Sequence, residues 1–143
     1  MKKFKFRLQS VLDVRSLHKK IAERDLAVAQ SQLNRTDKEI EENHDAWADT
    51  FKPEPSANQA LWFSLANQYR DGLIKEREEL EKRKDKLEEQ VSIKKTTLTR
   101  KMRDEMVLQK LEEHQRNEYM REIEAKEQAD IEEIDIMKRG TGE

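Results

Sequence analysis

The residues that break helices constrain the fold of this chain more than any other feature. Its only prolines are Pro53 and Pro55, and its 143 residues include only three glycines. Proline lacks a backbone N–H and clashes with the preceding turn, so a helix cannot pass through this pair. The breakers predict a helix at about 5–51, a turn at 52–57, a second helix at about 58–138 and a flexible tail at 139–143.

Composition favours long helices over a compact core. Charged residues make up 42% of the chain and apolar residues 34%, while 31 Asp and Glu nearly balance 29 Lys and Arg. Mixed-sign charge with periodic apolar residues is typical of helices that bury a narrow seam. We therefore expect residues 1–143 to form a single coiled-coil domain. The absence of cysteine excludes disulfides and thiolate chemistry.

A seven-residue repeat of apolar residues marks the first helix. The positions three residues later hold small or polar side chains. A strong row beside a small or polar row is typical of a thin coiled-coil seam. The strong row, broken by Lys19, is Leu12, Leu26, Leu33, Ile40 and Trp47, and the companion row is Ala22, Ala29, Thr36, Asn43 and Thr50.

The second helix carries a similar repeat. Leu73, Leu80 and Leu87 lie seven residues apart, and the spacing then shifts by four to Val91 and resumes at Leu98. Two such helices joined by a short link predict an all-α fold, an antiparallel coiled-coil hairpin.

The register of the hairpin follows from the place of the turn. With the turn near Pro55, residue i would face roughly residue 108 − i, and Arg7 would lie near Lys101. The second helix would then overhang the first, with Leu108 and Tyr119 in its unpaired part. A lone amphipathic helix has little stability, so we expect the overhang to fray or to pack on another chain.

Basic residues are concentrated where this register brings the two helices together. Residues 1–20 hold seven Lys or Arg against Asp13, and residues 94–103 hold five with no acid. Like charges brought together cost energy unless something offsets them, so we expect a basic collar that meets a partner. The acidic stretch at 112–137 argues against nucleic acid as that partner. The collar residues that we single out are Arg7, Arg15, Lys95, Arg100, Lys101 and Arg103.

No sequence motif indicates an enzyme or a cofactor. The chain lacks a glycine-rich phosphate loop, GxSxG and HExxH. Glu41 and His44 form one E-x-x-H, whereas di-iron bundles need two such motifs and two further Glu, so we expect no metal. No apolar run is long enough to span a membrane and no signal peptide is evident. We expect a cytoplasmic protein without direct membrane insertion.

Five aromatic residues lie close to the turn. A hairpin tip can be sealed by a local aromatic plug, but two helices cannot bury five large rings between them. Because Trp and Tyr are favoured at interfaces, the tip is also a candidate docking surface. These aromatics are Trp47, Phe51, Trp62, Phe63 and Tyr69.

Three segments resemble the flagellar export protein family FliJ. They are "FKFRLQSVLDVR" from Phe4 to Arg15, "AERDLAVAQSQL" from Ala22 to Leu33, and "LQKLEEHQRNEYMREIEAKEQADIEEI" from Leu108 to Ile134. The first is the most distinctive, with Phe6, Arg7, Leu8, Val11, Leu12 and Arg15 in an aromatic-Arg-Leu-x-x-Val-Leu-x-x-Arg pattern. The likeness spans nearly the whole chain.

The resemblance implies a fold and partners. Proteins of this family form a two-helix coiled coil similar to the gamma subunit, the central stalk of rotary ATPases. They engage the hexameric flagellar export ATPase through its pore, contact the cytoplasmic domain of the membrane export gate, and have been described as escorts of export chaperones. The implied location is cytoplasmic, peripherally associated with the export apparatus at the inner membrane.

The resemblance also suggests which residues contact each partner. Phe4, Phe6, Leu8 and Val11 would enter the ATPase ring together with the collar. The tip aromatics and Leu73 would contact the gate.

Three readings remain open at this stage. The first is a non-enzymatic stalk and adaptor of flagellar export, or its counterpart in injectisome secretion. The second is a structural coiled coil that homo-oligomerises through the free half of its second helix. The third is a nucleic-acid-binding coiled-coil arm.

Overall fold

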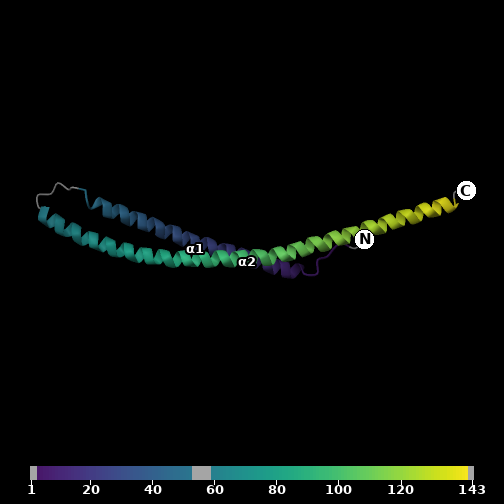
Figure 1. Cartoon of the computed structure of the whole chain (residues 1–143), viewed down its shortest axis with the longest axis horizontal. Coiled ribbons are helices and arrows are strands. Elements are labelled where there is room, and N and C mark those ends of the chain that lie inside the picture. Colours follow the sequence, from purple (N-terminus) through teal and green to yellow (C-terminus); the bar gives the residue numbers. More distant parts are fainter. Residues whose placement is uncertain (1–2, 53–58, 142–143) are drawn as a thin grey trace. The chain divides into compact units, whose positions relative to one another are not determined.

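The computed structural model describes residues 3–52 and 59–141, which fold into two long helices with no strand in those residues. Helix α1 spans Gln9–Asp49 and helix α2 spans Gln59–Thr141 (Figure 1). The helices pack against each other, as the prediction of an all-α helical hairpin requires. The predicted turn at 52–57 lies outside the described residues apart from Lys52. None of the described helical residues form a stretch long and apolar enough to cross a membrane.

The contacts divide the chain into two units. The terminal unit comprises Met1–Lys20 and Arg100–Glu143, and the hairpin unit comprises Ile21–Thr99. Helices α1 and α2 contribute to both. The prediction of a single domain remains a prediction.

The seam of the hairpin unit consists of leucines on α2 packed against small and polar residues on α1. The two helices run side by side in opposite directions (Figure 1). The strong row of α1 from Leu26 to Trp47 is only half-buried, whereas its companion row is buried. Small side chains at the facing positions leave room for the leucine side chains. The buried residues are Ala22, Ala29, Thr36 and Asn43 on α1, and Leu73, Leu80, Leu87 and Val91 on α2.

Polar contacts fix the register of this seam. The buried Asn43 Nδ2 donates to the Leu73 carbonyl at 3.0 Å. At the edge of the seam, Lys84 Nζ lies 3.0 Å from Asp37 Oδ1, and the hydrogen bond that it donates raises the pKa of Lys84 above its ordinary value. Asn43 Oδ1 is buried without a hydrogen-bond partner among the described residues, and the pairing of Asp37 with Lys84 is the contact here that depends on particular side chains being opposite each other.

The register differs from the one predicted. The numbers of the residues paired in Arg15–Asp104, Thr50–Arg70 and Asp37–Lys84 add up to between 119 and 121 rather than 108. The prediction that Arg7 lies near Lys101 was therefore wrong, and Arg15 is the residue that lies beside Lys101. The prediction assumed that both helices begin to pair at the turn. Instead, the end of α1 at Thr50 is bonded to Arg70, which lies eleven residues after the start of α2.

Arg70 closes the C-terminal end of α1. Its Nη2 donates to the Thr50 carbonyl and its Nε donates to Thr50 Oγ1, both at 2.8 Å. The last carbonyls of a helix lack partners within the helix and carry partial negative charge, so an arginine there is favourable. Its guanidinium also lies 4.0 Å from the centre of the Phe51 ring. Arg70 thereby joins the end of α1 to α2.

The ends of the helices differ by a few residues from those predicted. Helix α1 begins at Gln9 rather than near residue 5, because three cations, Lys3, Lys5 and Arg7, would otherwise lie at the positive end of its dipole. Helix α2 continues through Gly140 to Thr141, so residues 139–141 are not a tail, whereas residues 142–143 lie outside the described residues. Gly140 has a helical backbone, which costs about 1 kcal/mol relative to alanine.

A threonine-rich turn of α2 adjoins the border between the units. The hydroxyls of Thr96, Thr97 and Thr99 donate to the backbone carbonyls four residues earlier, at 3.0–3.1 Å. These carbonyls also accept the helix's own bonds. The hydroxyls are satisfied within α2 and are not used to hold α1.

We predict that Leu80→Ala lowers the free energy of unfolding by about 2–4 kcal/mol, because it opens a cavity in the seam. Leu80 is only 5% exposed. Urea denaturation followed by circular dichroism measures the change. Ile93 is 56% exposed on the same helix, and Ile93→Ala is the matched control, expected to change stability by less than about 0.5 kcal/mol. Equal losses in both variants would contradict a seam centred on Leu80.

Candidate functional site

The N-terminal segment of the terminal unit packs on α2 as an aromatic and aliphatic cluster. Phe6 is buried with Leu12 and Leu108, and Phe4, Leu8 and Leu111 pack against them. The Gln9 amide donates to the Phe6 carbonyl at 3.1 Å, which turns the chain just before α1. This turn lets Phe6 reach the seam from outside the helix.

Phe4 extends this cluster along α2. Its ring centre lies 5.7 Å from that of Tyr119, and the Arg116 guanidinium lies 5.7 Å from the centre of the Phe4 ring. Leu108 and Tyr119, which the predicted register left unpaired, are therefore covered by the N-terminal segment. The overhang of α2 begins only after Tyr119, and every residue from Glu124 to Thr141 is exposed.

A polar joint lies beside the cluster. Arg15 Nη1 donates to the Asp104 carbonyl at 2.8 Å, and Lys19 Nζ lies 3.1 Å from Glu105 Oε1. Gln109 Nε2 donates to the same oxygen at 2.7 Å, while Glu105 Oε2 is buried and makes no hydrogen bond within the described residues. A carboxylate this buried is stable only when a cation faces it.

Some collar residues of the terminal unit contact other side chains or the backbone of the unit, whereas others are exposed without an ion pair among the described residues. Arg15 is half-buried and bonded, and Lys101 is half-buried beside it. Together they line a small cavity of about 240 Å³ with Val11, Val14, His18 and Asp104. Arg7, Arg100 and Arg103 are exposed and make no ion pair within residues 3–52 and 59–141. Lys95, also exposed, belongs to the hairpin unit.

The predicted ring-contact residues divide in the same way. Phe6 is only 8% exposed, so its side chain supports the cluster rather than offering a surface. Phe4 and Leu8 are half-buried against it, whereas Val11 is 41% exposed. Arg7, Val11, Arg100 and Arg103 are thus the exposed members of the predicted contact in this unit.

Two of the tip aromatics are part of the helix pairing. Trp47 and Phe51 meet edge to face, with ring centres 4.7 Å apart. Each is covered by an arginine of α2, with Arg70 over Phe51 and Arg77 at 5.7 Å over Trp47. Arg77 Nη2 also lies 3.0 Å from His44 Nδ1. Leu73 is buried in the seam, and a partner would have to separate the helices to reach it.

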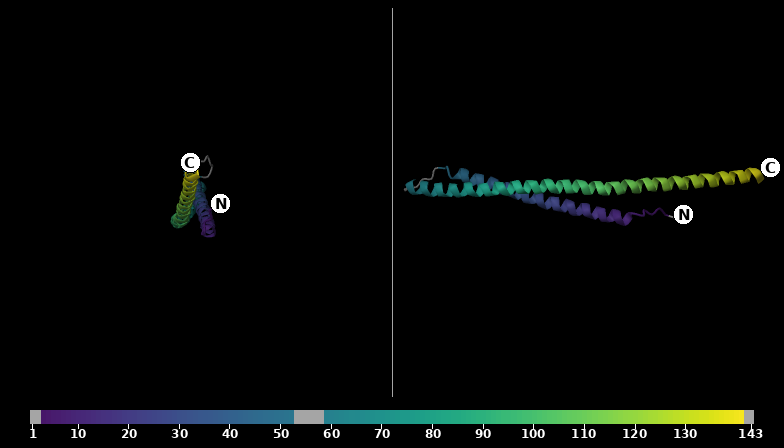
Figure 2. Two further views of the ribbon diagram at one scale, coloured as in Figure 1. Left: turned by 90° about the vertical axis from the view of Figure 1, so that its right-hand side faces the viewer. Right: turned by 60° about the horizontal axis from the view of Figure 1, so that its bottom comes forward.

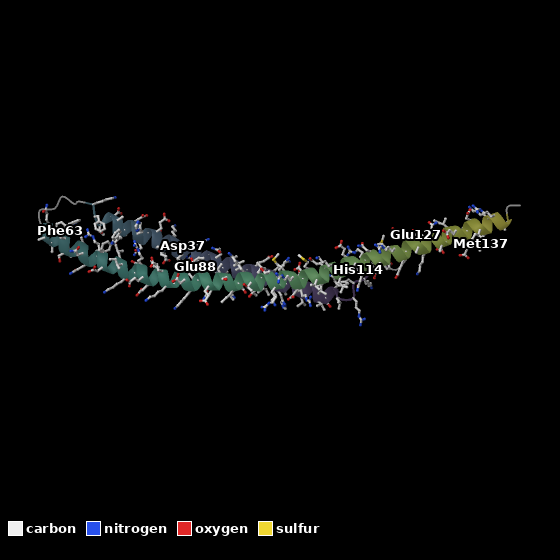
Figure 3. The ribbon with its side chains drawn as sticks, viewed as in Figure 1. Asp37, Phe63, Glu88, His114, Glu127 and Met137 are labelled. Carbon is white, nitrogen blue, oxygen red and sulfur yellow. The ribbon has the colours of Figure 1, made fainter. Side chains whose placement is uncertain are left out.

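The other three aromatics lie on the first turns of α2. Trp62 and Phe63 meet edge to face at 5.1 Å, and Phe63 and Tyr69 are each more than half exposed. Figure 3 marks Phe63 near the start of α2. Trp62 and Tyr69 line an open groove of about 680 Å³. The groove is mostly apolar, with one cation and one acid at its edge. The other residues that line it are Ala46, Asp49, Thr50, Lys52, Leu65 and Ala66.

The polar joint and the arginine cap were not predicted from the sequence. Lys19, which interrupts the strong row of α1, was a signal that an acid faces it. Arg70 lies seven residues before Arg77, and this spacing places both on one face of α2, opposite Phe51 and Trp47. No group of three or more His, Asp or Glu side chains within the described ranges is arranged to hold a metal ion.

Comparison with known proteins identifies one family. The family model described as "Flagellar FliJ protein" matches residues 4–140 of the chain. The match includes the N-terminal cluster, both helices and all but the end of the overhang. No curated protein and no solved structure matches the chain.

We predict that Lys19→Met lowers the free energy of unfolding by about 1–3 kcal/mol, because it leaves the buried Glu105 carboxylate without its cation. The double variant Lys19→Met with Glu105→Leu should recover most of this loss, because no buried charge then remains. Urea unfolding measures both. Lys84→Met, which breaks a more exposed pair with Asp37, is the control and should cost less than about 1 kcal/mol. If the double variant is no more stable than Lys19→Met, the joint is not an ion pair that the fold requires.

Proposed function

Because the chain belongs to the flagellar FliJ protein family, a family of export proteins rather than enzymes, we propose that it is a non-enzymatic stalk and adaptor of flagellar type III export. In this proposal the terminal unit engages the hexameric export ATPase, and the hairpin tip engages the cytoplasmic domain of the membrane export gate. The protein would act in the cytoplasm, peripherally associated with the export apparatus. The match over residues 4–140 is the observation that carries the proposal.

The free arginines support the terminal unit as the ATPase contact. Arg7, Arg100 and Arg103 are exposed and have no acidic partner among the described residues. Charges of one sign on a surface attract a partner of opposite sign and speed its association. The proposed contact therefore consists mainly of these arginines and Val11, with Lys95, Arg15 and Lys101 beside them in sequence.

The N-terminal cluster has a supporting role in this proposal. Phe6 and Leu12 hold the segment that carries Arg7 against α2, and Arg15 is bonded to the α2 backbone. A segment fixed in this way loses less conformational entropy when it binds. Phe4 and Leu8 belong to the same support.

The groove at the tip supports the hairpin unit as the gate contact. Its apolar lining includes Trp62, Leu65 and Tyr69, and Lys52 and Asp49 lie at its edge. Interfaces are commonly anchored by aromatic side chains within a polar rim. Trp47, Phe51 and Leu73, by contrast, hold the helices together, so the proposed contact consists of Trp62, Phe63 and Tyr69.

We predict that the triple variant Arg7→Glu, Arg100→Glu and Arg103→Glu weakens stimulation of the export ATPase and keeps its helicity. Single reversals should have little effect, because exposed ion pairs contribute only about 0.2–1 kcal/mol each. ATP hydrolysis by the ATPase, titrated with wild-type or variant chain, measures stimulation.

The matched control for this variant reverses three exposed lysines of the hairpin unit, Lys75, Lys82 and Lys86. It changes the net charge by the same amount and should stimulate normally. Normal stimulation by the arginine variant, or equal loss in both, would rule out the arginines as the ATPase contact.

We predict that Phe63→Ala and Tyr69→Ala each weaken gate binding by about 2 kcal/mol, since exposed aromatic anchors at an interface centre cost this much on truncation. ATPase stimulation should survive. Binding of the purified gate domain measured by calorimetry, and export in motile cells, are the readouts.

Trp47→Ala provides the contrasting variant, because Trp47 packs on Phe51 and Arg77 and its loss should lower thermal stability. If Phe63→Ala and Tyr69→Ala behave like Trp47→Ala, losing stability and both activities together, these rings are a structural plug and not a docking surface.

A further inference from the structure

Beyond Tyr119, the last residue that the N-terminal segment covers, α2 carries a further row of apolar residues, which begins next to Tyr119 and is turned away from the seam formed by Leu108 and Leu111. Six positions of this row keep the alternating spacing of three and four residues that places side chains on one helix face. Four hold apolar residues, of which Met120, Ile134 and Met137 are 49%, 52% and 62% exposed. We name these positions the tail stripe: Met120, Ile123, Glu127, Asp130, Ile134 and Met137.

The tail stripe lacks a partner helix. Figure 2 shows α2 continuing past the N-terminal segment, and Figure 3 shows Glu127 and Met137 with no other helix beside them. The rest of this part of α2 is mostly polar, with the pairs Gln128–Glu132 at 3.2 Å and Asp135–Arg139 at 3.3 Å, although the exposed Ile131 and Ile136 also lie outside the stripe. Glu127 and Asp130 have no such partner among the described residues. This part of α2 is therefore amphipathic, with two free acids in the middle of its apolar face.

These acids oppose pairing of the tail with a second tail. In a parallel pair each acid would face its own copy, and in an antiparallel pair Glu127 would face Asp130. Like charges at facing seam positions destabilise a coiled coil. Homo-oligomerisation through this part of α2 alone is therefore disfavoured. A helix that places a cation opposite these acids would suit the tail stripe better.

Helix α1 carries such a face. Leu12, Arg15 and Lys19 point towards α2, and the helical repeat of 3.6 residues turns Val14 and Leu17 to the other side. Val14 and Leu17 are 50% and 55% exposed. The sequence continues the same spacing of three and four residues, and its one polar position is an arginine. We name these positions the outer stripe: Val14, Leu17, Ile21, Arg24 and Val28.

We propose that the tail stripe of one copy packs on the outer stripe of a second copy, and the reverse, to form a closed dimer. The five positions of the outer stripe share their spacing with the first five of the tail stripe, and Arg24 is opposite in charge to the acids of the tail. Aligned in one direction, Val14 faces Met120, Leu17 faces Ile123, Arg24 faces Asp130 and Val28 faces Ile134, and Ile21 lies beside Glu127.

Symmetry fixes the direction of this pairing. In the terminal unit α1 and α2 run in opposite directions, as the contacts Arg15–Asp104 and Phe4–Tyr119 require. In a dimer with two-fold symmetry, each tail stripe packs on the outer stripe of the other copy. If both contacts form at once, the two copies of α2 run antiparallel. Each α1 then runs parallel to the tail that it contacts. If α1 of one copy ran antiparallel to the tail of the other, two copies could not form both contacts at once. Each added copy would then leave a free stripe, and the copies would assemble into an open chain.

Sedimentation equilibrium of the full chain over a concentration series tests the dimer. We expect a monomer–dimer equilibrium whose Kd rises by about tenfold or more in Leu17→Ser and in Ile134→Ser. Ile93→Ser removes an equally exposed residue outside both stripes and is the control, with Kd unchanged. A wild-type chain that is monomeric throughout, or an effect of Ile93→Ser equal to the others, would overturn the proposal.

Charge exchange separates the contact from general effects on folding. Arg24→Glu should raise Kd by about tenfold or more, and the double variant Arg24→Glu with Asp130→Arg should restore dimerisation because each pair is again of opposite sign. Circular dichroism checks that helicity is kept. Failure of the double variant to recover, with helicity intact, would contradict the pairing of Arg24 with Asp130.

The absence of cysteine from the chain allows a direct test of the direction. Leu17→Cys mixed with Ile123→Cys should give a disulfide between two chains under mild oxidation, whereas Leu17→Cys mixed with Ile134→Cys should not. Cross-linking of the second mixture alone would mean antiparallel packing and would overturn the closed dimer. None of these readouts uses the ATPase or the gate. They therefore test the dimer independently of the proposed function.

Discussion

The packing of α2 leucines on the small and polar row of α1 is the constraint on which the other features of this protein depend. A seam this thin buries few side chains, and Leu73, Leu80 and Leu87 are each 5–9% exposed. Hydrophobic burial alone would tolerate a shift by one heptad, because the leucines recur every seven residues. The guanidinium of Arg70 removes this freedom, since it bonds the carbonyl and the hydroxyl of Thr50 at the end of α1, and α1 has only one such end. Polar groups thus set the register that apolar groups make stable.

The register then decides which side chains are free. It brings Arg15 and Lys19 to the α2 backbone and to Glu105, so two cations that the sequence grouped with the collar are used inside the fold. It also brings Phe4 to Tyr119. Of the collar residues in the terminal unit that the sequence singled out, only Arg7, Arg100 and Arg103 remain exposed and without an ion pair among the described residues.

The sequence predicted the two helices and the heptad rows because proline and glycine act locally and a seven-residue repeat is visible without a structure. It did not predict the register, because the end of α1 is bonded to Arg70, well inside α2, and no local rule says which residue of the second helix lies beside the end of the first. For the candidate sites it identified the aromatic and basic groups but not their exposure. Phe6 and Leu73 look like Phe63 and Leu65 in the sequence, and only packing separates the buried pair from the exposed one. Lys19 interrupts an apolar row, which indicates that an acid lies opposite it. Because α2 has many glutamates, the sequence does not show that this acid is Glu105.

The threonine-rich turn of α2 has a mechanical consequence. A carbonyl that accepts a hydroxyl as well as an amide shares its lone pairs, and such back-bonding weakens a helix locally and favours curvature. Thr96, Thr97 and Thr99 concentrate three such bonds within about one turn, next to the point where contacts pass from one unit to the other. Under a sideways load α2 would flex at this turn at a lower cost than along its leucine-lined length. The three threonines thus gather this local weakening in one turn of α2 without interrupting the helix.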